Sequence, residues 1–243
     1  CLRAANHVIS ISDSFSPYLR DRGVAEQACS VIPNWAPVDE ITPQSRENAW
    51  SSEQGLDGQF TFLYSGTLGF KHRPELLVRL AEAVAPLGAG VVVNSRGAVA
   101  DWLREQVREL GLKNFQINDF QPIERLPEVL ASGDVLIGML APDAADYCVP
   151  SKILSNHCAG RAQLLSLNEK NPAAQLVLDR KTGFVASPAD PEAFLLAAKQ
   201  LIEQPEERRA MGQRAREAAE ELFNIQKIAP RFAEIFERVA GVA

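Results

Sequence analysis

The chain has 243 residues, of which 46% are apolar and 23% are charged, and its formal net charge is −6 at pH 7. This length suits one large domain or two small ones, and the composition is typical of globular proteins. The negative charge argues against non-specific binding to nucleic acid, and no apolar run is long enough to span a bilayer. Any site for an anion must therefore be local.

Two short apolar runs open the chain. Residues 7–11 and 29–32 predict strands, with a helix between them over residues 16–22. From there to residue 58 the sequence is polar and interrupted by Pro and Gly, with one short helix expected near residues 45–52. We therefore place the best domain boundary at residue 58.

From residue 60 the pattern becomes regular. Strands are expected at residues 60–64, 90–94, 115–118, 135–139, 163–167 and 183–185. Helices are expected at residues 74–84, 98–110, 125–131, 150–160, 173–178, 191–203, 206–223 and 225–239. This alternation predicts an α/β fold, a parallel sheet with helices on both faces. Ligands bind such sheets at the carboxyl ends of the strands, where the strand order reverses, so the loops after strands are the candidate sites.

The strongest candidate is the loop and helix start that follow the strand at 135–139. Pro150 suits the first turn of a helix, and we expect Ser151 to be its N-cap. The free N–H groups and the helix dipole favour an anion there, and Lys152 adds a full charge. Asp146, just ahead of the helix, is placed to face a sugar.

The loop at residues 65–73 is a second candidate. Its two glycines let backbone N–H groups approach a phosphate, and Lys71, His72 and Arg73 supply charge. It matches neither the Walker A motif nor the dinucleotide fingerprint. A tight strand–helix turn with a solvated basic end explains this loop equally well.

Two further loops follow strands. Residues 94–97 include Arg96, although an ordinary turn is the simpler interpretation. Phe120 and Gln121 are placed to offer an apolar face and backbone groups to a nucleobase, with a plain loop as the alternative. No Ser–His–Asp or Cys–His arrangement supports a hydrolase triad. The Arg and Glu residues of the helix at 206–223 predict a salt-bridged, solvated face.

The four cysteines show no CxxC spacing and predict reduced thiols in a reducing compartment. Cys148, His157 and Cys158 are conceivable metal ligands, but no second ligand pair at metal spacing accompanies them. We therefore expect no metal site and interpret His157 and Cys158 as core residues. The chain starts at Cys1 rather than Met and soon enters strand-like sequence, which favours a fragment of a longer protein.

Taken in order, these stretches resemble the carboxyl-terminal half of a family 4 glycosyltransferase with the GT-B fold, in which two Rossmann-like domains face one another across the active site. Residues 66–71 resemble the family's first glycine loop, and residues 119–121 resemble the stretch that touches the base. Residues 149–161 resemble its Pro-x-Lys donor motif. The sequence of residues 143–152 is similar to that of the family's branch that builds colanic acid and O-antigen and adds fucose-type sugars.

The resemblance implies roles for individual residues. Lys71, Lys152 and Asp146 would be catalytic. The donor contacts would be Gly66, Thr67, Arg96, Phe120, Gln121, Pro150, Ser151 and Ser155. The sequence departs from the family at Thr67, where Arg is frequent, at Ser155, where the second of two Glu is frequent, and at Ala162, which replaces the usual Pro.

The implied function is a retaining, metal-independent transferase that moves a hexose-type sugar from a nucleoside diphosphate, UDP or GDP, to a glycan or lipid-linked acceptor in surface polysaccharide (lipopolysaccharide) biosynthesis. The helix amino-terminus and the two lysines would stabilise the leaving diphosphate without a metal or other cofactor. Residues 1–58 would be the end of an amino-terminal domain and the interdomain linker. Residues 59–223 would bind the donor, and residues 224–243 would be a helix packing back towards the amino-terminal domain.

The resemblance also implies a cytoplasmic protein, peripheral to the membrane where its acceptor is lipid-linked, and a donor half that is inactive alone. Two alternatives stay open. A UDP-sugar epimerase of the GT-B fold would need catalytic acids and a His in the cleft, for which we find no convincing set. A non-catalytic nucleotide-binding module is favoured by Ser155 and by the missing acceptor half.

Overall fold

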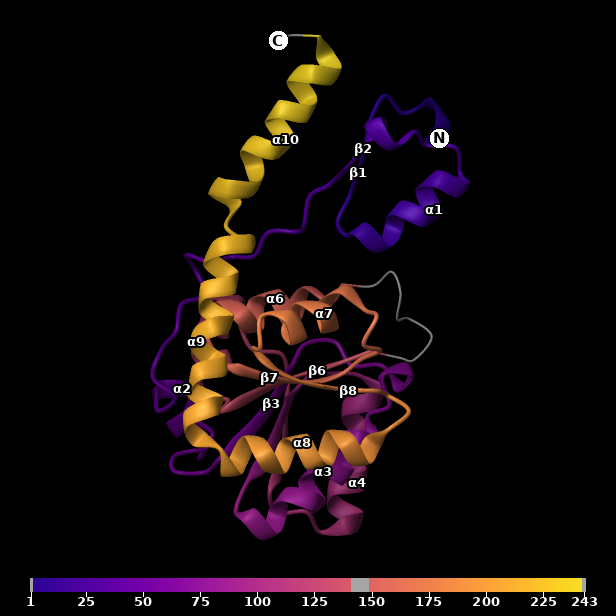
Figure 1. Cartoon of the computed structure of the whole chain (residues 1–243). Helices are drawn as coiled ribbons and strands as arrows, with labels where there is room; N and C mark the ends of the chain where they lie inside the picture. The colour runs from indigo at the N-terminus through magenta and orange to yellow at the C-terminus, as the bar shows by residue number, and fades with distance from the viewer. Residues whose placement is uncertain (1, 141–148, 242–243) are drawn as a thin grey trace.

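The computed structural model describes residues 2–140 and 149–241, so Asp146 and Cys148 lie outside the described residues. Its centre is a six-stranded sheet (Figure 1). The strands are β3 (Thr61–Ser65), β4 (Gly90–Asn94), β5 (Phe115–Asn118), β6 (Val135–Met139), β7 (Ala162–Ser166) and β8 (Gly183–Ala186). All neighbouring pairs are parallel, which confirms the predicted parallel sheet.

The strand order is β5-β4-β3-β6-β7-β8. The chain builds outward from β3 to β5, returns to the centre and then builds outward in the other direction from β6. The order therefore reverses between β3 and β6, which is the arrangement of a doubly wound, Rossmann-like sheet. The loops that follow β3 and β6 diverge at this point and leave room for a ligand.

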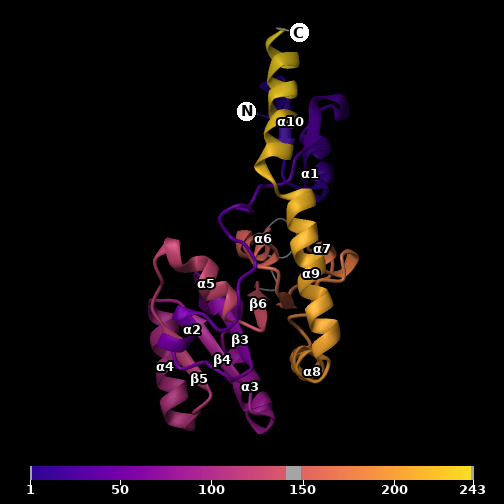
Figure 2. The ribbon, with the colours of Figure 1, turned by 90° about the vertical axis from the view of Figure 1, so that its left-hand side faces the viewer.

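Helices cover both faces of this sheet (Figures 1 and 2). One face carries α3 (Glu75–Val84), α4 (Ala98–Leu110) and α8 (Pro191–Glu203), and the other carries α2 (Ala49–Glu53), α5 (Leu126–Ala131), α6 (Ser151–Cys158) and α7 (Pro172–Asp179). The long helix α9 (Pro205–Leu222) contributes side chains to both layers. Because strand side chains alternate, Phe62 and Tyr64 pack into the first layer and Leu63 into the second.

A small separate layer lies beyond the sheet and contains both ends of the described chain (Figures 1 and 2). It consists of the parallel pair β1 (Val8–Ser10) and β2 (Cys29–Val31), helix α1 (Ser16–Asp21) and helix α10 (Ile225–Ala240). Ile32 packs with Ile228 and Ile235 of α10. Arg231 donates a hydrogen bond of 2.7 Å to the carbonyl of Val31. The first and last segments of the chain are thus held together.

The short helix expected near residues 45–52 lies slightly later, at α2. Its N-cap is Asn48, whose side chain accepts the backbone N–H of Ser51, while the Ser51 hydroxyl accepts the N–H of Asn48. This reciprocal capping fixes the start of the helix at Ala49, because residues ahead of an N-cap lie outside the helix. No helix in the described part of the chain is both long and apolar enough to cross a membrane.

Candidate functional site

A cavity of about 440 Å³ opens at the point where the strand order reverses. Its walls come from the loop after β3, the loop after β5, the end of β6 and the start of α6. Eight of the predicted site residues line it: Gly66, Thr67, Phe120, Gln121, Pro150, Ser151, Lys152 and Ser155. The structure therefore brings together residues that are up to about ninety positions apart in the sequence.

Lys152 supplies the charge of this cavity. Part of its side chain is exposed, but the Nζ atom is fully buried and has no hydrogen-bond partner among the described residues. It lies 3.4 Å from the centre of the Tyr64 ring, an arrangement in which the aromatic face attracts the cation. Burial lowers the pKa of Lys152 to about 7. A buried amine with no anion beside it is costly, and a bound anion would relieve that cost.

Gly66 allows this close approach. Its φ is +127°, which side-chain-bearing residues rarely adopt, and a Cβ atom there would lie 3.2 Å from Nζ of Lys152. The Tyr64 hydroxyl donates a hydrogen bond of 2.6 Å to the carbonyl of Thr67 and so fixes the loop just after the strand. The backbone of this loop, rather than its side chains, therefore faces the lysine.

The prediction that Ser151 caps α6 is wrong. The N-cap is Pro150, whose carbonyl accepts the N–H of Ile153 at 3.0 Å, so Ser151 is already the first helical residue. Proline has no side-chain acceptor, so no side chain caps the first turn of α6. Its free N–H groups remain available to an anion at the cavity wall.

Of the two basic residues Lys71 and His72 in the loop after β3, His72 is the one that faces the cavity. The side chain of Lys71 is exposed and does not line the cavity, whereas His72 does. The imidazole accepts the N–H of Gly69 through Nδ1 at 3.0 Å, which turns the ring inward. Burial, and then the charges of Lys152 and Lys71, lower the pKa of His72. A role for Lys71 stays a prediction.

The far end of the cavity is formed by Phe120 and Gln121. Gln121 accepts a hydrogen bond of 2.9 Å from the indole N–H of Trp50, a fully buried residue of α2. The guanidinium of Arg96 lies 5.3 Å from the centre of the Phe120 ring, but Arg96 is exposed and does not itself line the cavity. Arg96 therefore reaches the site only through Phe120.

Eight described lining residues are absent from the predicted site: Tyr64, Ser65, His72, Asn156 and the apolar Leu126, Leu130, Met139 and Leu140. The sequence pattern places Tyr64 only in a strand. A signal was present, because a tyrosine at the end of a buried strand needs a hydrogen-bond partner for its hydroxyl, which here is the next loop. Asn156 carried no such signal, since its place depends on the packing of α6.

His157 and Cys158 are core residues, as expected. Both are fully buried, and Nδ1 of His157 donates to the carbonyl of Ile153 at 2.7 Å. Burial lowers the pKa of His157 to about 4 and raises the pKa of the Cys158 thiol to about 11. Among residues 2–140 and 149–241, no three His, Cys, Asp or Glu side chains gather as ligands for a metal ion.

No protein-family model matches the chain. It is 23% identical over 236 residues to WcaI of Escherichia coli (strain K12), whose description is that of a colanic acid biosynthesis glycosyl transferase; the match covers 95% of this chain and 57% of WcaI. The chain thus spans little more than half the length of this relative.

Solved structures share the fold. HepE of Anabaena in complex with UDP matches 97% of this chain and 65% of its own, with a TM-score of 0.83 and 17% identity. Sucrose-phosphate synthase of Thermosynechococcus elongatus matches 100% of this chain and 60% of its own, with a TM-score of 0.80 and 20% identity. The chain is therefore related in sequence to WcaI and has the fold of the carboxyl-terminal half of a GT-B glycosyltransferase.

Proposed function

We propose that this chain is the donor-binding half of a glycosyltransferase that takes its sugar from a nucleoside diphosphate. The observation that carries the proposal is the buried Nζ of Lys152, which has no hydrogen-bond partner among the described residues and lies in the cavity beside an uncapped helix start. The relationship to WcaI and the likeness to HepE, which was solved with UDP, support the same reading.

The chemistry follows from what these groups can stabilise. When the bond to the sugar breaks, the diphosphate leaves with additional negative charge. Lys152, the free N–H groups of α6 and the backbone of the loop at Gly66 then face that charge in a partly dry cavity, where fixed donors and cations act strongly. Transfer with retention and without a divalent ion belongs to this proposal.

The nucleobase would lie against Phe120, with Gln121 held in place by Trp50. Among the described residues this end of the cavity offers an aromatic face and an amide, and UDP and GDP remain the two candidate donors. UDP is the first choice because HepE was solved with it. The acceptor would be a glycan or a lipid-linked sugar bound by a second domain, at the cytoplasmic face of a membrane where the acceptor is lipid-linked.

No observation favours the epimerase alternative. Among the described lining residues there is one histidine, His72, and no carboxylate, so the acids that such a reaction needs are not among them. The non-catalytic alternative predicts nucleotide binding without transfer. An assay of transfer by the two-domain protein separates it from our proposal.

The donor site can be tested on this chain by isothermal titration with UDP, GDP and dTDP. We expect one diphosphate to bind and Lys152→Ala to weaken it at least tenfold, with an unchanged circular dichroism spectrum. Lys199→Ala, which removes an exposed lysine of α8, is the matched control and should bind normally. If Lys152→Ala binds as tightly as the wild type, the proposed site is wrong. Transfer by the two-domain protein should persist in EDTA.

A further inference from the structure

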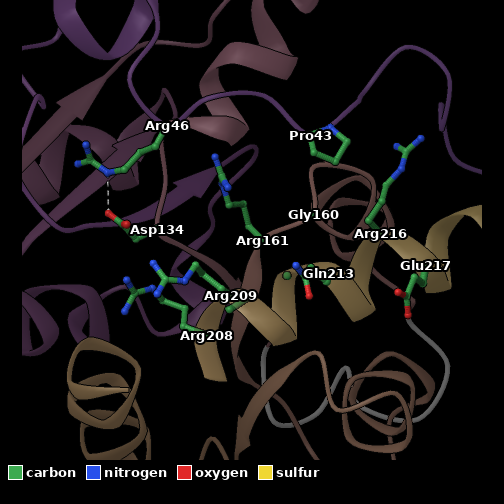
Figure 3. A pocket seen from close by; sticks show the side chains of 12 residues that line it. Pro43, Arg46, Asp134, Gly160, Arg161, Arg208, Arg209, Gln213, Arg216 and Glu217 are labelled. Atoms are coloured by element: carbon green, nitrogen blue, oxygen red, sulfur yellow. Dashed lines mark hydrogen bonds and ion pairs between the residues drawn. The ribbon is translucent and has the colours of Figure 1, made fainter. Parts of the chain in front are cut away.

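A second cavity, of about 560 Å³, lies at the amino ends of β6 and β7, whereas the donor cavity lies at the carboxyl ends of the strands (Figure 3). Five arginines line it: Arg46, Arg161, Arg208, Arg209 and Arg216. The only carboxylates among the described lining residues are Asp134 and Glu217. Such a concentration of positive charge is unexpected in a chain of net charge −6 and calls for a physical reason.

Two of the arginines have a structural task. Arg161 donates to the carbonyl of Ala131 at the end of α5 (2.7 Å) and to that of Gln44 (2.9 Å). Arg216 donates to the carbonyl of Cys158 at the end of α6 (3.1 Å). The last carbonyls of a helix have no partner within the helix, so these side chains satisfy them and tie the segment before β3 to the domain.

The other three arginines also contact protein groups, but each leaves guanidinium N–H groups without a partner among the described residues. Arg46 pairs with Asp134 through Nε at 2.8 Å, the contact drawn as a dashed line in Figure 3. Its Nη2 donates to the carbonyls of Leu56 and Gln59, so only its Nη1 has no partner among the described residues. Arg208 uses only Nη1 in hydrogen bonds, to carbonyls at the end of α8, and its Nε and Nη2 have no partner among the described residues. Arg209 pairs through Nη2 with Glu206, and its Nε and Nη1 have no partner there either. Unused N–H groups of adjacent guanidinium groups thus remain at one cavity.

The carboxylate of Asp134 is shared among several arginines. Burial is the main cause that lowers the pKa of Arg161 and of Arg208. Asp134 raises the pKa of both and is the next largest influence, whereas Arg46 lowers both and Arg209 lowers that of Arg208. The main cost is therefore the burial of guanidinium groups in a partly dry space, and a bound anion would reduce that cost.

We propose that this cavity binds a small phosphorylated anion through Arg46, Arg208 and Arg209. The planar guanidinium fork matches two oxygens of a phosphoryl group, which makes arginine the usual residue for such ligands. The cavity is separate from the donor site, because it opens at the amino ends of the strands and the donor site opens at their carboxyl ends. Since Arg46 precedes β3 and the other two belong to α9, the anion would join these segments.

Pyrophosphate is the probe, and isothermal titration is the assay. Because pyrophosphate also suits the donor cavity, every protein is tested with Lys152→Ala in the background. We expect one saturable site that Arg208→Gln/Arg209→Gln weakens at least tenfold. The control Arg108→Gln/Arg214→Gln removes two arginines that do not line the cavity and should leave binding unchanged. No binding in the Lys152→Ala background, or equal loss in the control, would overturn the proposal.

Four further measurements keep the test decisive. Arg209→Gln alone removes a side chain whose one hydrogen bond among the described residues is to the exposed Glu206, so the variant should fold normally and still bind pyrophosphate more weakly. On the Lys152→Ala protein, pyrophosphate should shift the NMR signals of arginine Nε–H groups, and unshifted signals would refute the site.

Citrate should bind more weakly than pyrophosphate, and equal affinity would overturn the phosphoryl preference. UDP binding by Arg208→Gln/Arg209→Gln with Lys152 intact should stay normal, which separates this inference from the donor site.

Discussion

The proposed donor site predicts that the affinity of this chain for a nucleoside diphosphate falls as the pH rises above 7, because Lys152 must carry a proton to attract it. Burial lowers the pKa of Lys152 to about 7 in the empty site, so about half of the molecules have a neutral amine at pH 7. A bound diphosphate places negative charge beside Nζ and raises this pKa, so binding takes up a proton.

The size of the effect follows from the protonated fraction. Below the pKa the amine is already charged, and the affinity does not depend on this proton. Above it, each pH unit reduces the competent form about tenfold, and the apparent Kd rises in proportion. Between pH 7 and pH 9 the Kd should rise roughly 50-fold, or about 2.3 kcal/mol. The terminal phosphate titrates near pH 6 and so does not interfere in this range.

Isothermal titration with UDP, or with GDP if that ligand binds, from pH 7 to pH 9 measures this slope. Lys152→Arg keeps its charge throughout and should show a nearly flat profile, and Lys152→Ala should be both flat and weak. The surroundings lower the pKa of His72, so that ring is neutral over the whole range and adds no slope. A flat profile for the wild type, or an equal slope in Lys152→Arg, would refute the reasoning.

Three further outcomes are expected. The folded-state pKa of Lys152, about 7, lies below its unfolded value, so the free energy of unfolding of the wild type should rise by about 4 kcal/mol between pH 6 and pH 10. Lys152→Met should lack this gain in urea titrations, and an equal pH dependence of the unfolding free energy in both proteins would contradict it. Gln121→Leu deprives the buried indole N–H of Trp50 of its acceptor and should cost about 1–3 kcal/mol in urea denaturation, which an unchanged midpoint would disprove. Gly212→Ala places a Cβ atom 2.5 Å from the carbonyl oxygen of Gly160 and should cost about 1–3 kcal/mol, visible as a lower Tm; an equal Tm would mean that α9 shifts freely.

The secondary structure was well predicted, because its signals are local. The bounds of β4, β5, α4 and α8 agree with the sequence interpretation to the residue. Continuous apolar runs marked the buried strands, and α4 ends where Gly111 adopts a φ of +65°. The parallel sheet followed from the alternation of strands and helices. The order of the strands did not, since it depends on pairings that periodicity does not encode.

Within the site, the place of the cavity and half of its described lining residues were predicted, but the orientation of side chains was not. The sequence favoured Lys71 over its neighbour His72, and only the turn at Gly69 decides which of them faces inward. Ser151 failed as an N-cap because Pro150 took that position. Asp146 lies outside the described residues, so its role stays a prediction.

The cavity lined by five arginines shows a second limit of prediction from the sequence. The helix at residues 206–223 was interpreted as a salt-bridged, solvated face, and Arg214 and Arg216 do pair with glutamates. Arg208 instead lines a cavity together with Arg46, which precedes it by more than one hundred and sixty residues. No sequence pattern on one helix could show that partner, because it arrives through tertiary packing.

The pairing of β1–β2 with α10 has a consequence for synthesis on the ribosome. Arg231 and Val31 are 200 residues apart, yet they are in direct contact. At about 5–20 residues per second, the first strands would wait roughly 10–40 s for the helix that covers Ile32. The sheet, whose strands follow one another closely in sequence, can form during that interval. Until α10 is made, Ile32 lacks the partners Ile228 and Ile235 that cover it in the folded chain.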